Sequence, residues 1–193
     1  MNLEEIESFC PTDQQEWRDW LANNHNKQQS VWLVLYKAKS GKLNLSWSDA
    51  VDEALCFGWI DSIRKPIDEE KFVQFFSKRK PNSNWSRINK QKIERLFAKG
   101  KMTAAGINSI EIAKENGSWT ILDDIEDLVI PHDLETELAS HSVANEFFQG
   151  LSKSIKKQIL YWLASAKREE TRNKRLQTII SETSQRKIPN GFR

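Results

Sequence analysis

The segment Ser46-Trp-Ser-Asp-Ala-Val-Asp-Glu-Ala-Leu-Cys-Phe-Gly-Trp-Ile-Asp61 predicts a helix, a turn and the start of a strand in direct succession. Ser46 and Asp49 have the spacing of a capping box, with the aspartate in place of the usual glutamate. Gly58 suits the left-handed residue that ends a helix. The apolar residues between them recur at helical spacing and form one face, made of Trp47, Ala50, Val51, Ala54 and Leu55.

Three strands are predicted around this segment. Residues 30–36 are β-branched and aromatic, which is typical of a well-buried strand. Residues 59–66 and 71–76 flank a short acidic turn and therefore predict two further strands that form a hairpin. Pro66 suits a strand end, because proline cannot donate a hydrogen bond to a neighbouring strand.

Helices account for most of the remaining chain. Thr12, either Ser83 or Asn84, and Thr103 are placed to cap helices over about residues 13–24, 85–99 and 104–116. Two short helices and then two longer ones are expected beyond residue 131. Two segments are expected to lack regular structure: residues 1–11, which are loose, and residues 118–131, which are acidic and irregular.

The order of these elements predicts an α+β fold. A small, mostly antiparallel sheet of about three strands forms the N-terminal part together with helices, and a helical C-terminal part follows. A change in composition near residues 118–130 marks a boundary between a subdomain of residues 1–120, which carries the tryptophan-rich motifs, and a helical subdomain of residues 121–193. We expect the two to form one compact unit, because each alone has few apolar residues to bury.

The net charge of +2 over 193 residues conceals alternating blocks of charge. Residues 1–63, 64–101, 102–150 and 151–193 carry net charges of −5, +8, −9 and +8. In one interpretation, which we favour, neighbouring blocks neutralise one another in the fold. In the other, the two basic blocks form one anion-binding surface.

Several classes of protein are excluded or disfavoured. No apolar run approaches the roughly 20 residues of a membrane span, and the acidic N-terminus is unlike a signal peptide, so we expect a cytoplasmic protein. Cys10 and Cys56 lie outside any CxxC pattern and do not predict a disulfide in a reducing compartment. No P-loop, GxGxxG or GxSxG motif is present, so the sequence predicts no cofactor.

Four motifs resemble those of the YdeI/OmpD-associated proteins, also called bacteriocin-protection proteins. The first is the segment quoted above, and the resemblance extends over about residues 30–187. The others are Arg79-Lys-Pro-Asn-Ser-Asn-Trp-Ser-Arg-Ile-Asn89, Gly100-Lys-Met-Thr-Ala-Ala-Gly106 and Ala166-Lys-Arg-Glu-Glu-Thr-Arg-Asn-Lys-Arg175.

The resemblance implies a bacterial stress or resistance protein, and it brings no established enzyme activity or cofactor. Its name implies protection against bacteriocins or cationic antimicrobial peptides and association with an outer-membrane porin. A porin partner is at odds with the absence of an export signal. The acidic segments could instead attract a cationic peptide.

Residues of the first two motifs predict a ligand-binding site. Arg79 and Ser83, close to the start of a helix, suit a phosphate or carboxylate, because a guanidinium and free backbone N–H groups bind such anions. Trp59 and Trp85 could form an apolar wall. In the alternative interpretation, which we favour slightly, Asp61 pairs with Arg79 to close the hairpin and both tryptophans lie in the core.

Two further polar residues are predicted to face inward. Asn89 is four residues after Trp85 and is expected to bond either the preceding loop or a ligand. Arg172 precedes Leu176 by one helical turn and needs an acidic partner, either from the −9 block or Asp61. It either forms a salt bridge between the subdomains or completes an anion site with Arg79.

The carboxylates of the helix after Ser46 do not favour a metal site. Asp49, Asp52 and Glu53 share a face with Cys56, and no histidine lies near them in sequence. This pattern is more typical of a solvated or salt-bridged face.

Three functions follow, in order of preference. The first is a non-enzymatic protein that binds a protein partner or a cationic peptide. The second is a pocket protein or enzyme that binds a small anionic ligand. The third, nucleic-acid binding through the basic blocks, is disfavoured by the acidic blocks. The sequence carries no signal for oligomeric state.

Overall fold

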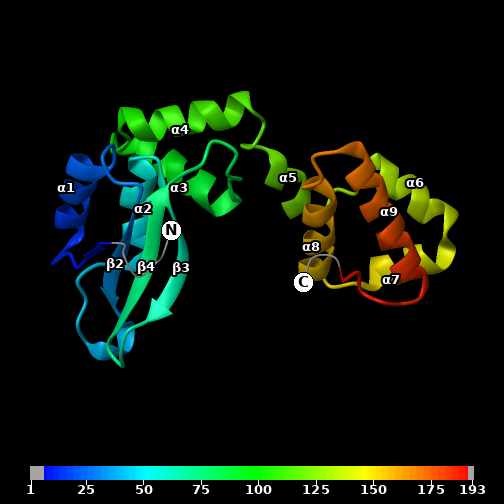
Figure 1. Cartoon of the computed structure of the whole chain (residues 1–193), viewed down its shortest axis with the longest axis horizontal. Helices are drawn as coiled ribbons and strands as arrows, with labels where there is room; N and C mark the ends of the chain where they lie inside the picture. Colours follow the sequence, from blue (N-terminus) through cyan, green and yellow to red (C-terminus); the bar gives the residue numbers. More distant parts are fainter. Residues whose placement is uncertain (1–6, 191–193) are drawn as a thin grey trace. The chain divides into compact units, whose positions relative to one another are not determined.

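The computed structural model describes residues 7–190 and divides the chain into two compact units, Met1–Trp119 and Thr120–Arg193 (Figure 1). Each unit has its own cluster of buried apolar side chains. The first unit is built on a four-stranded mixed sheet with helices, and the second is helical. The predicted α+β fold class is therefore confirmed.

The sheet of the first unit has the strand order β1-β2-β4-β3. β4 (Lys71–Lys78) pairs antiparallel with both β2 (Ser30–Tyr36) and β3 (Trp59–Pro66). β1 (Ser8–Phe9) pairs parallel with β2, where the sequence predicts only a loose segment. The prediction is wrong for these two residues, because a strand of two residues is too short to show an alternating pattern. Its part over residues 1–6 lies outside the described residues.

Four α-helices accompany this sheet in the first unit. α1 (Gln14–Asn24) and α2 (Trp47–Cys56) contact each other, and α2 also contacts β3, α3 (Arg87–Ala98) and α4 (Ala104–Glu115). A short 3-10 helix, η2 (Ala38–Ser40), follows β2. In Figure 1, α4 runs past the end of the sheet at which β3 begins. α2 is thus the element that connects the sheet to the other helices.

Two predicted helix caps are wrong and two are confirmed. Asp13 rather than Thr12 caps α1, because its carboxylate accepts the Glu16 N–H at 2.9 Å. Ser86, rather than a residue at position 83 or 84, caps α3 through its hydroxyl. Ser46 and Thr103 cap α2 and α4 as predicted.

Tryptophan supplies much of the first unit's core. Trp17, Trp59 and Trp85 are fully buried, and the Trp17 indole donates to the Ala50 carbonyl at 3.1 Å. Trp47, predicted on the apolar face of α2, is instead 48% exposed. It occupies the first position of α2, and the buried residues of that helix begin only at Ala50.

The second unit contains five helices between residues 120 and 190. Their bounds are α5 (Ile121–Glu126), α6 (His132–Ser140), α7 (Ser142–Gly150), α8 (Lys153–Ala164) and α9 (Glu169–Ser184). The four later helices correspond to those predicted. α5 lies in the segment predicted to be irregular, because a six-residue helix with one buried side chain carries little periodic signal.

Ion pairs join blocks of opposite charge within each unit. In the first, Asp52 binds both Lys92, at 2.6 Å, and Arg95. In the second, Asp133 binds Arg172 at 2.6 Å. These pairs follow the interpretation in which neighbouring blocks neutralise one another.

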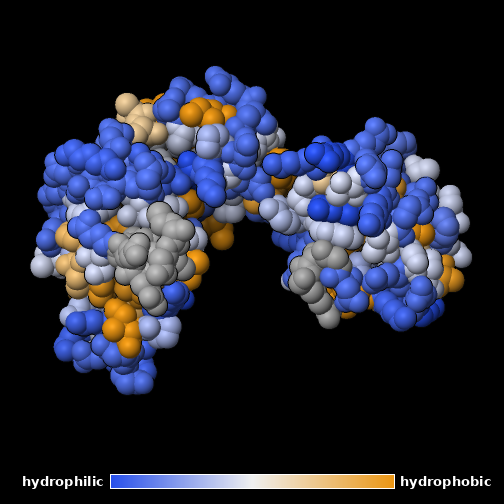
Figure 2. Space-filling model, in the orientation of Figure 1, coloured by the Kyte–Doolittle hydropathy of each residue, from blue (hydrophilic) through white to orange (hydrophobic). Residues whose placement is uncertain are grey.

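The visible surface of both units is mostly hydrophilic, with small separate apolar patches (Figure 2). Within residues 7–190, no helix combines the length and the hydropathy that crossing a membrane requires.

Candidate functional site

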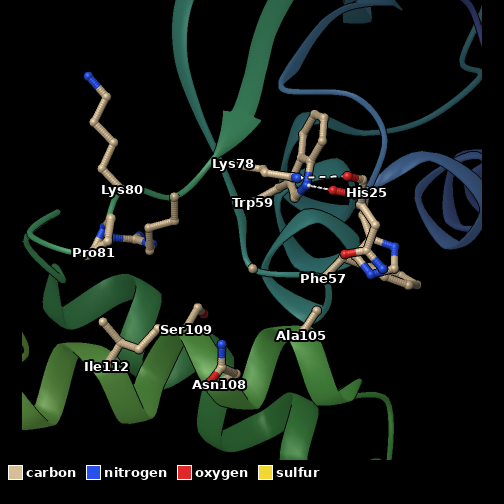
Figure 3. A pocket seen from close by; sticks show the side chains of 13 residues that line it. His25, Phe57, Trp59, Lys78, Lys80, Pro81, Ala105, Asn108, Ser109 and Ile112 are labelled. Atoms are coloured by element: carbon tan, nitrogen blue, oxygen red, sulfur yellow. Dashed lines mark hydrogen bonds between the residues drawn. The ribbon is translucent and has the colours of Figure 1, made fainter.

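A pocket of about 220 Å³ lies in the first unit where α1 ends, β3 begins and β4 ends (Figure 3). One face of α4 closes its remaining side. Thirteen residues line it: His25, Asn26, Phe57, Gly58, Trp59, Lys78, Arg79, Lys80, Pro81, Ala105, Asn108, Ser109 and Ile112. None of them carries a carboxylate side chain.

Two glycines bring α4 close enough to form this wall. Gly58 has a φ of +72°, and a Cβ there would lie 3.0 Å from the Ala105 carbonyl oxygen. A Cβ on Gly106 would lie 2.3 Å from the Cys56 carbonyl oxygen. The Thr103 hydroxyl, which also caps α4, donates to that same carbonyl at 2.7 Å. The glycines of the first and third motifs therefore let α4 approach closely enough to form one side of the pocket.

Arg79 is the most unusual residue of the pocket. Its guanidinium stacks on the Trp85 ring at 3.7 Å from the ring centre, and its Nη1 donates to the Asn84 carbonyl at 2.8 Å. Burial lowers the pKa of Arg79 to about 10, and the negative charge of Asp61 opposes this only in part. Among the ion pairs of the described residues, none involves Arg79.

Two buried donors at this point have no hydrogen-bond acceptor among residues 7–190. They are the Nε of Arg79 and the indole Nε1 of Trp85. Buried donors in folded proteins nearly always find a partner in the protein or in ordered water. The pocket thus adjoins a partly buried cation and two buried N–H groups that lack an acceptor.

Two other polar side chains of the pocket donate hydrogen bonds to backbone carbonyls. Lys78 Nζ donates to the Asn26 carbonyl at 3.1 Å, and Trp59 Nε1 to the His25 carbonyl at 3.4 Å, as Figure 3 shows. The Lys80 side chain is exposed and extends away from α4 in the same view. Three consecutive cationic residues of the β4 end therefore give the pocket a positive potential.

The structure brings together some of the residues predicted for the site. Trp59 and Arg79 line the pocket, and Trp85 supports the Arg79 guanidinium. Both tryptophans are buried in the core, as the alternative interpretation expects. That interpretation also pairs Asp61 with Arg79, but the Asp61 carboxylate instead accepts the Trp47 indole N–H at 2.9 Å.

Ser83 and Asn89 lie near the pocket in sequence but do not line it. The Ser83 N–H closes a turn onto the Lys80 carbonyl at 2.9 Å. The Asn89 N–H donates to the capping Ser86 hydroxyl at 3.3 Å. Because α3 begins at Arg87, its N-terminus is later than predicted and is already capped.

Arg172 belongs to the second unit. Its Nε and Nη2 donate to the two Asp133 carboxylate oxygens at 2.6 and 2.9 Å, so an acid of the −9 block is its partner, as predicted. The salt bridge lies within the second unit and does not join two subdomains, because α6 and α9 both follow Thr120. These hydrogen bonds hold the pKa of Asp133 below its ordinary value.

The sequence prediction missed the wall from α4 and the contribution of the α1 end. The sequence signal that could have indicated the α4 wall is the pair Gly58 and Gly106. Both glycines permit close backbone approach, which is expected where a helix packs on a turn. Nothing in the sequence around His25 or Asn26 marks them as neighbours of β4, because the contact joins segments far apart in the chain.

The carboxylate face of α2 is salt-bridged and largely buried. Glu53 is 1% exposed and accepts hydrogen bonds from Gln14, Arg18 and Lys101 at 2.5, 2.5 and 3.2 Å. Burial raises the pKa of the Cys56 thiol beside this network to about 11. In the described part of the chain, no group of three or more histidines, cysteines and acids is arranged to hold a metal ion.

Two family models match the chain. Residues 9–109 match a domain of unknown function (DUF8412), and residues 127–186 match the family described as bacteriocin-protection, YdeI or OmpD-associated. The predicted resemblance is thus confirmed for the region that includes its last motif, whereas the first three motifs lie in the region of the other family. No curated protein and no solved structure matches the chain.

Proposed function

The chain belongs to the family of the domain of unknown function DUF8412, and we propose that the first unit, which contains the matched region, binds a small anionic ligand. The second unit contains a YdeI or OmpD-associated domain, described as bacteriocin-protecting. The two matches do not overlap, so the first unit's function is argued from its own pocket.

The observation that carries the proposal is Arg79, a partly buried cation that has a buried Nε and takes part in no ion pair among the described residues. Burying a charge is costly unless it is paired, and an unmade hydrogen bond at a buried donor adds to that cost. Arg79 has one carbonyl and one aromatic ring as partners, and its Nε is unsatisfied. A phosphate or carboxylate beside the guanidinium would supply the missing charge and acceptors.

The size and lining of the pocket narrow the class of ligand. About 220 Å³ is below the usual range of roughly 300–1,000 Å³ for drug-sized ligands. A single phosphate or carboxylate with a small organic body fits this volume, and a dinucleotide does not. Phe57 and Ile112 provide an apolar surface for that body.

A thermal-shift titration of the full chain tests the proposal. Inorganic phosphate, acetate and a small sugar phosphate serve as probes, with chloride to match ionic strength. At ten times its Kd, a ligand should raise Tm by about 3–6 °C. The Arg79→Met variant should lose this shift, whereas Arg168→Met, the same change at an exposed arginine of the second unit, should keep it. No shift with any probe up to saturating concentrations would contradict the proposal.

A second candidate function, binding of a cationic peptide, is favoured by a groove in the second unit. The groove has a volume of about 500 Å³ and includes Asp123 and Asp124. Two of its apolar residues, Ile121 and Val129, are 43% and 51% exposed. An acidic groove with apolar walls suits a peptide that carries both lysines and leucines.

This candidate predicts salt-sensitive binding. A model peptide of alternating lysine and leucine clusters should bind the full chain, with affinity falling as salt rises. The double change Asp123→Asn and Asp124→Asn should weaken binding, whereas Glu115→Gln in α4 should not. Equal binding by all three proteins would exclude the groove as the site.

A further inference from the structure

A second hollow lies at the other end of the same sheet, where η2, the start of α2 and β3 approach one another. Its volume is about 380 Å³. It is lined by Tyr36, Lys37, Ala38, Lys39, Leu43, Leu45, Ser46, Trp47, Arg64 and Phe72. We call it the distal groove, and it shares no residue with the pocket around Arg79.

The floor and walls of the distal groove are apolar. Leu45 and Phe72 are almost fully buried and form the floor. Leu43 and Trp47 form the walls and remain 72% and 48% exposed. In Figure 2, apolar colour gathers at the lower end of the first unit, the end with η2 and the β3–β4 turn. Large apolar side chains left exposed around a hollow are typical of a ligand-binding groove.

The indole of Trp47 is held in a fixed orientation. Its N–H donates to the Asp61 carboxylate at 2.9 Å. This bond satisfies the polar edge of the ring and leaves its apolar surface to the groove. The same bond engages Asp61, so the nearest carboxylate of β3 does not face the groove as a free charge.

The rim of the groove is cationic, and no carboxylate side chain lines it. Arg64 lies over the Phe72 ring at 3.6 Å, and within residues 7–190 it takes part in no ion pair. Lys37 Nζ donates to the backbone carbonyl of Asp68. Lys39 pairs with Glu69 at 3.0 Å, but both side chains are exposed, so that pair is weak.

We propose that the distal groove binds an amphipathic organic anion, a carboxylate with an acyl or aromatic body. The body lies on Leu45 and Phe72 between Leu43 and Trp47. The carboxylate meets Arg64, whose guanidinium is positioned by its stacking on Phe72 and forms no ion pair within the described residues. Because the distal groove combines an apolar floor with the Arg64 cation, its ligand needs a larger apolar body than the compact anion proposed for the Arg79 pocket.

The experiment follows the Trp47 indole N–H signal of the full chain by NMR, assigned from its loss in Trp47→Phe. The probe is octanoate, with 1-octanol as an uncharged analogue and inorganic phosphate as an anion without an apolar body. Octanoate should shift the signal saturably, octanol should bind at least about fivefold more weakly, and phosphate should not move it.

Matched variants separate the contributions. Arg64→Gln should weaken octanoate binding at least about fivefold and leave octanol binding unchanged. Leu43→Ser should weaken both ligands, and Arg168→Gln neither. Arg79→Met should not change octanoate binding, so failure at one site does not affect the test of the other. A non-saturating shift, or equal effects of Arg64→Gln and Arg168→Gln, would overturn the proposal.

A membrane surface is the other occupant that exposed leucine, tryptophan and basic residues would suit. Vesicles of phosphatidylglycerol and phosphatidylcholine test for it by sedimentation. If the wild-type chain binds these vesicles in a manner that Leu43→Ser abolishes, and octanoate does not shift the Trp47 signal, the groove is a membrane contact and the proposal is wrong.

Discussion

Arg79 carries a charge that the fold shields from water without supplying an anion. Burial lowers its folded pKa to about 10, well below the ordinary value of an arginine, so folding disfavours the charged form. In the window between these values the unfolded chain binds more protons, and this residue makes stability rise with pH. Below that window the full penalty is present.

The first prediction concerns this penalty. Arg79→Met keeps an unbranched apolar side chain at this position but removes the charge, together with the guanidinium that stacks on Trp85 and bonds the Asn84 carbonyl. We expect the free energy of unfolding at pH 7 to increase by about 1–2 kcal/mol, measured by urea denaturation without added anions. Arg168→Met should change it by less than about 0.5 kcal/mol. A loss of stability in Arg79→Met would mean that the stacking and the Asn84 bond outweigh the unpaired charge.

Glu53 is the opposite case, a buried charge with several partners. Burial raises its pKa, but the hydrogen bonds from Arg18, Gln14 and Lys101 outweigh burial, and the pKa is lower than 4.5. Its stabilising contribution is therefore fully present above about pH 4.5 and is lost as the pH falls through the lowered folded value.

The second prediction is that the difference in unfolding free energy between the wild type and Glu53→Gln depends on pH. Glu53→Gln should lose about 2 kcal/mol of stability at pH 7, because Arg18 and Lys101 keep only a neutral partner. The difference from the wild type should shrink as the pH falls below about 4.5, measured by urea denaturation. Glu115→Gln, at an exposed carboxylate of α4, should show no such trend. A constant difference across this range would show that Glu53 does not titrate in it.

At the scale of elements, the docking of α4 on the end of α2 decides whether the Arg79 pocket exists. Gly106 lies against the Cys56 carbonyl, and any Cβ there would overlap a backbone atom that cannot easily move. The Thr103 hydroxyl reinforces the same contact from the preceding residues.

The third prediction is that Gly106→Ala displaces α4. We expect it to cost about 1–3 kcal/mol of stability despite alanine's better helix propensity, because overpacking outweighs propensity. It should also abolish the phosphate-induced thermal shift. The control is Gly150→Ala, because an added Cβ at this helical glycine would have no atom within 4 Å. This variant should have the same stability as the wild type or a higher one. Unchanged stability in Gly106→Ala would show that α4 does not dock so closely.

The sequence predicted those elements that carry a local signal. The pattern of residues 30–36 matches β2 in full, and Ser46 and Gly58 bound α2 as predicted. β1 and α5 were missed because two and six residues contain too little periodicity. Trp59 and Arg79 could be identified from their motifs, but the α4 wall could not, because it depends on a contact between distant segments.

At the scale of the whole molecule, the division near residue 120 separates two cores. The second unit buries its own apolar set, which includes Leu134, Phe148, Ile159 and Ile179. Its basic and acidic blocks also pair internally, through Arg172 with Asp133 and through other ion pairs. A helical unit with its own core and its own charge pairing is expected to fold independently.

The fourth prediction combines these features. Residues 120–193 expressed alone should give a helical circular-dichroism spectrum and a cooperative thermal transition, and inorganic phosphate should leave its Tm unchanged. Arg172→Ala should lower that Tm, because it leaves the half-buried Asp133 without its bidentate partner. In the full chain, Arg172→Ala should leave the phosphate-induced shift of the first unit's transition intact. Loss of that shift would instead show that Arg172 contributes to anion binding.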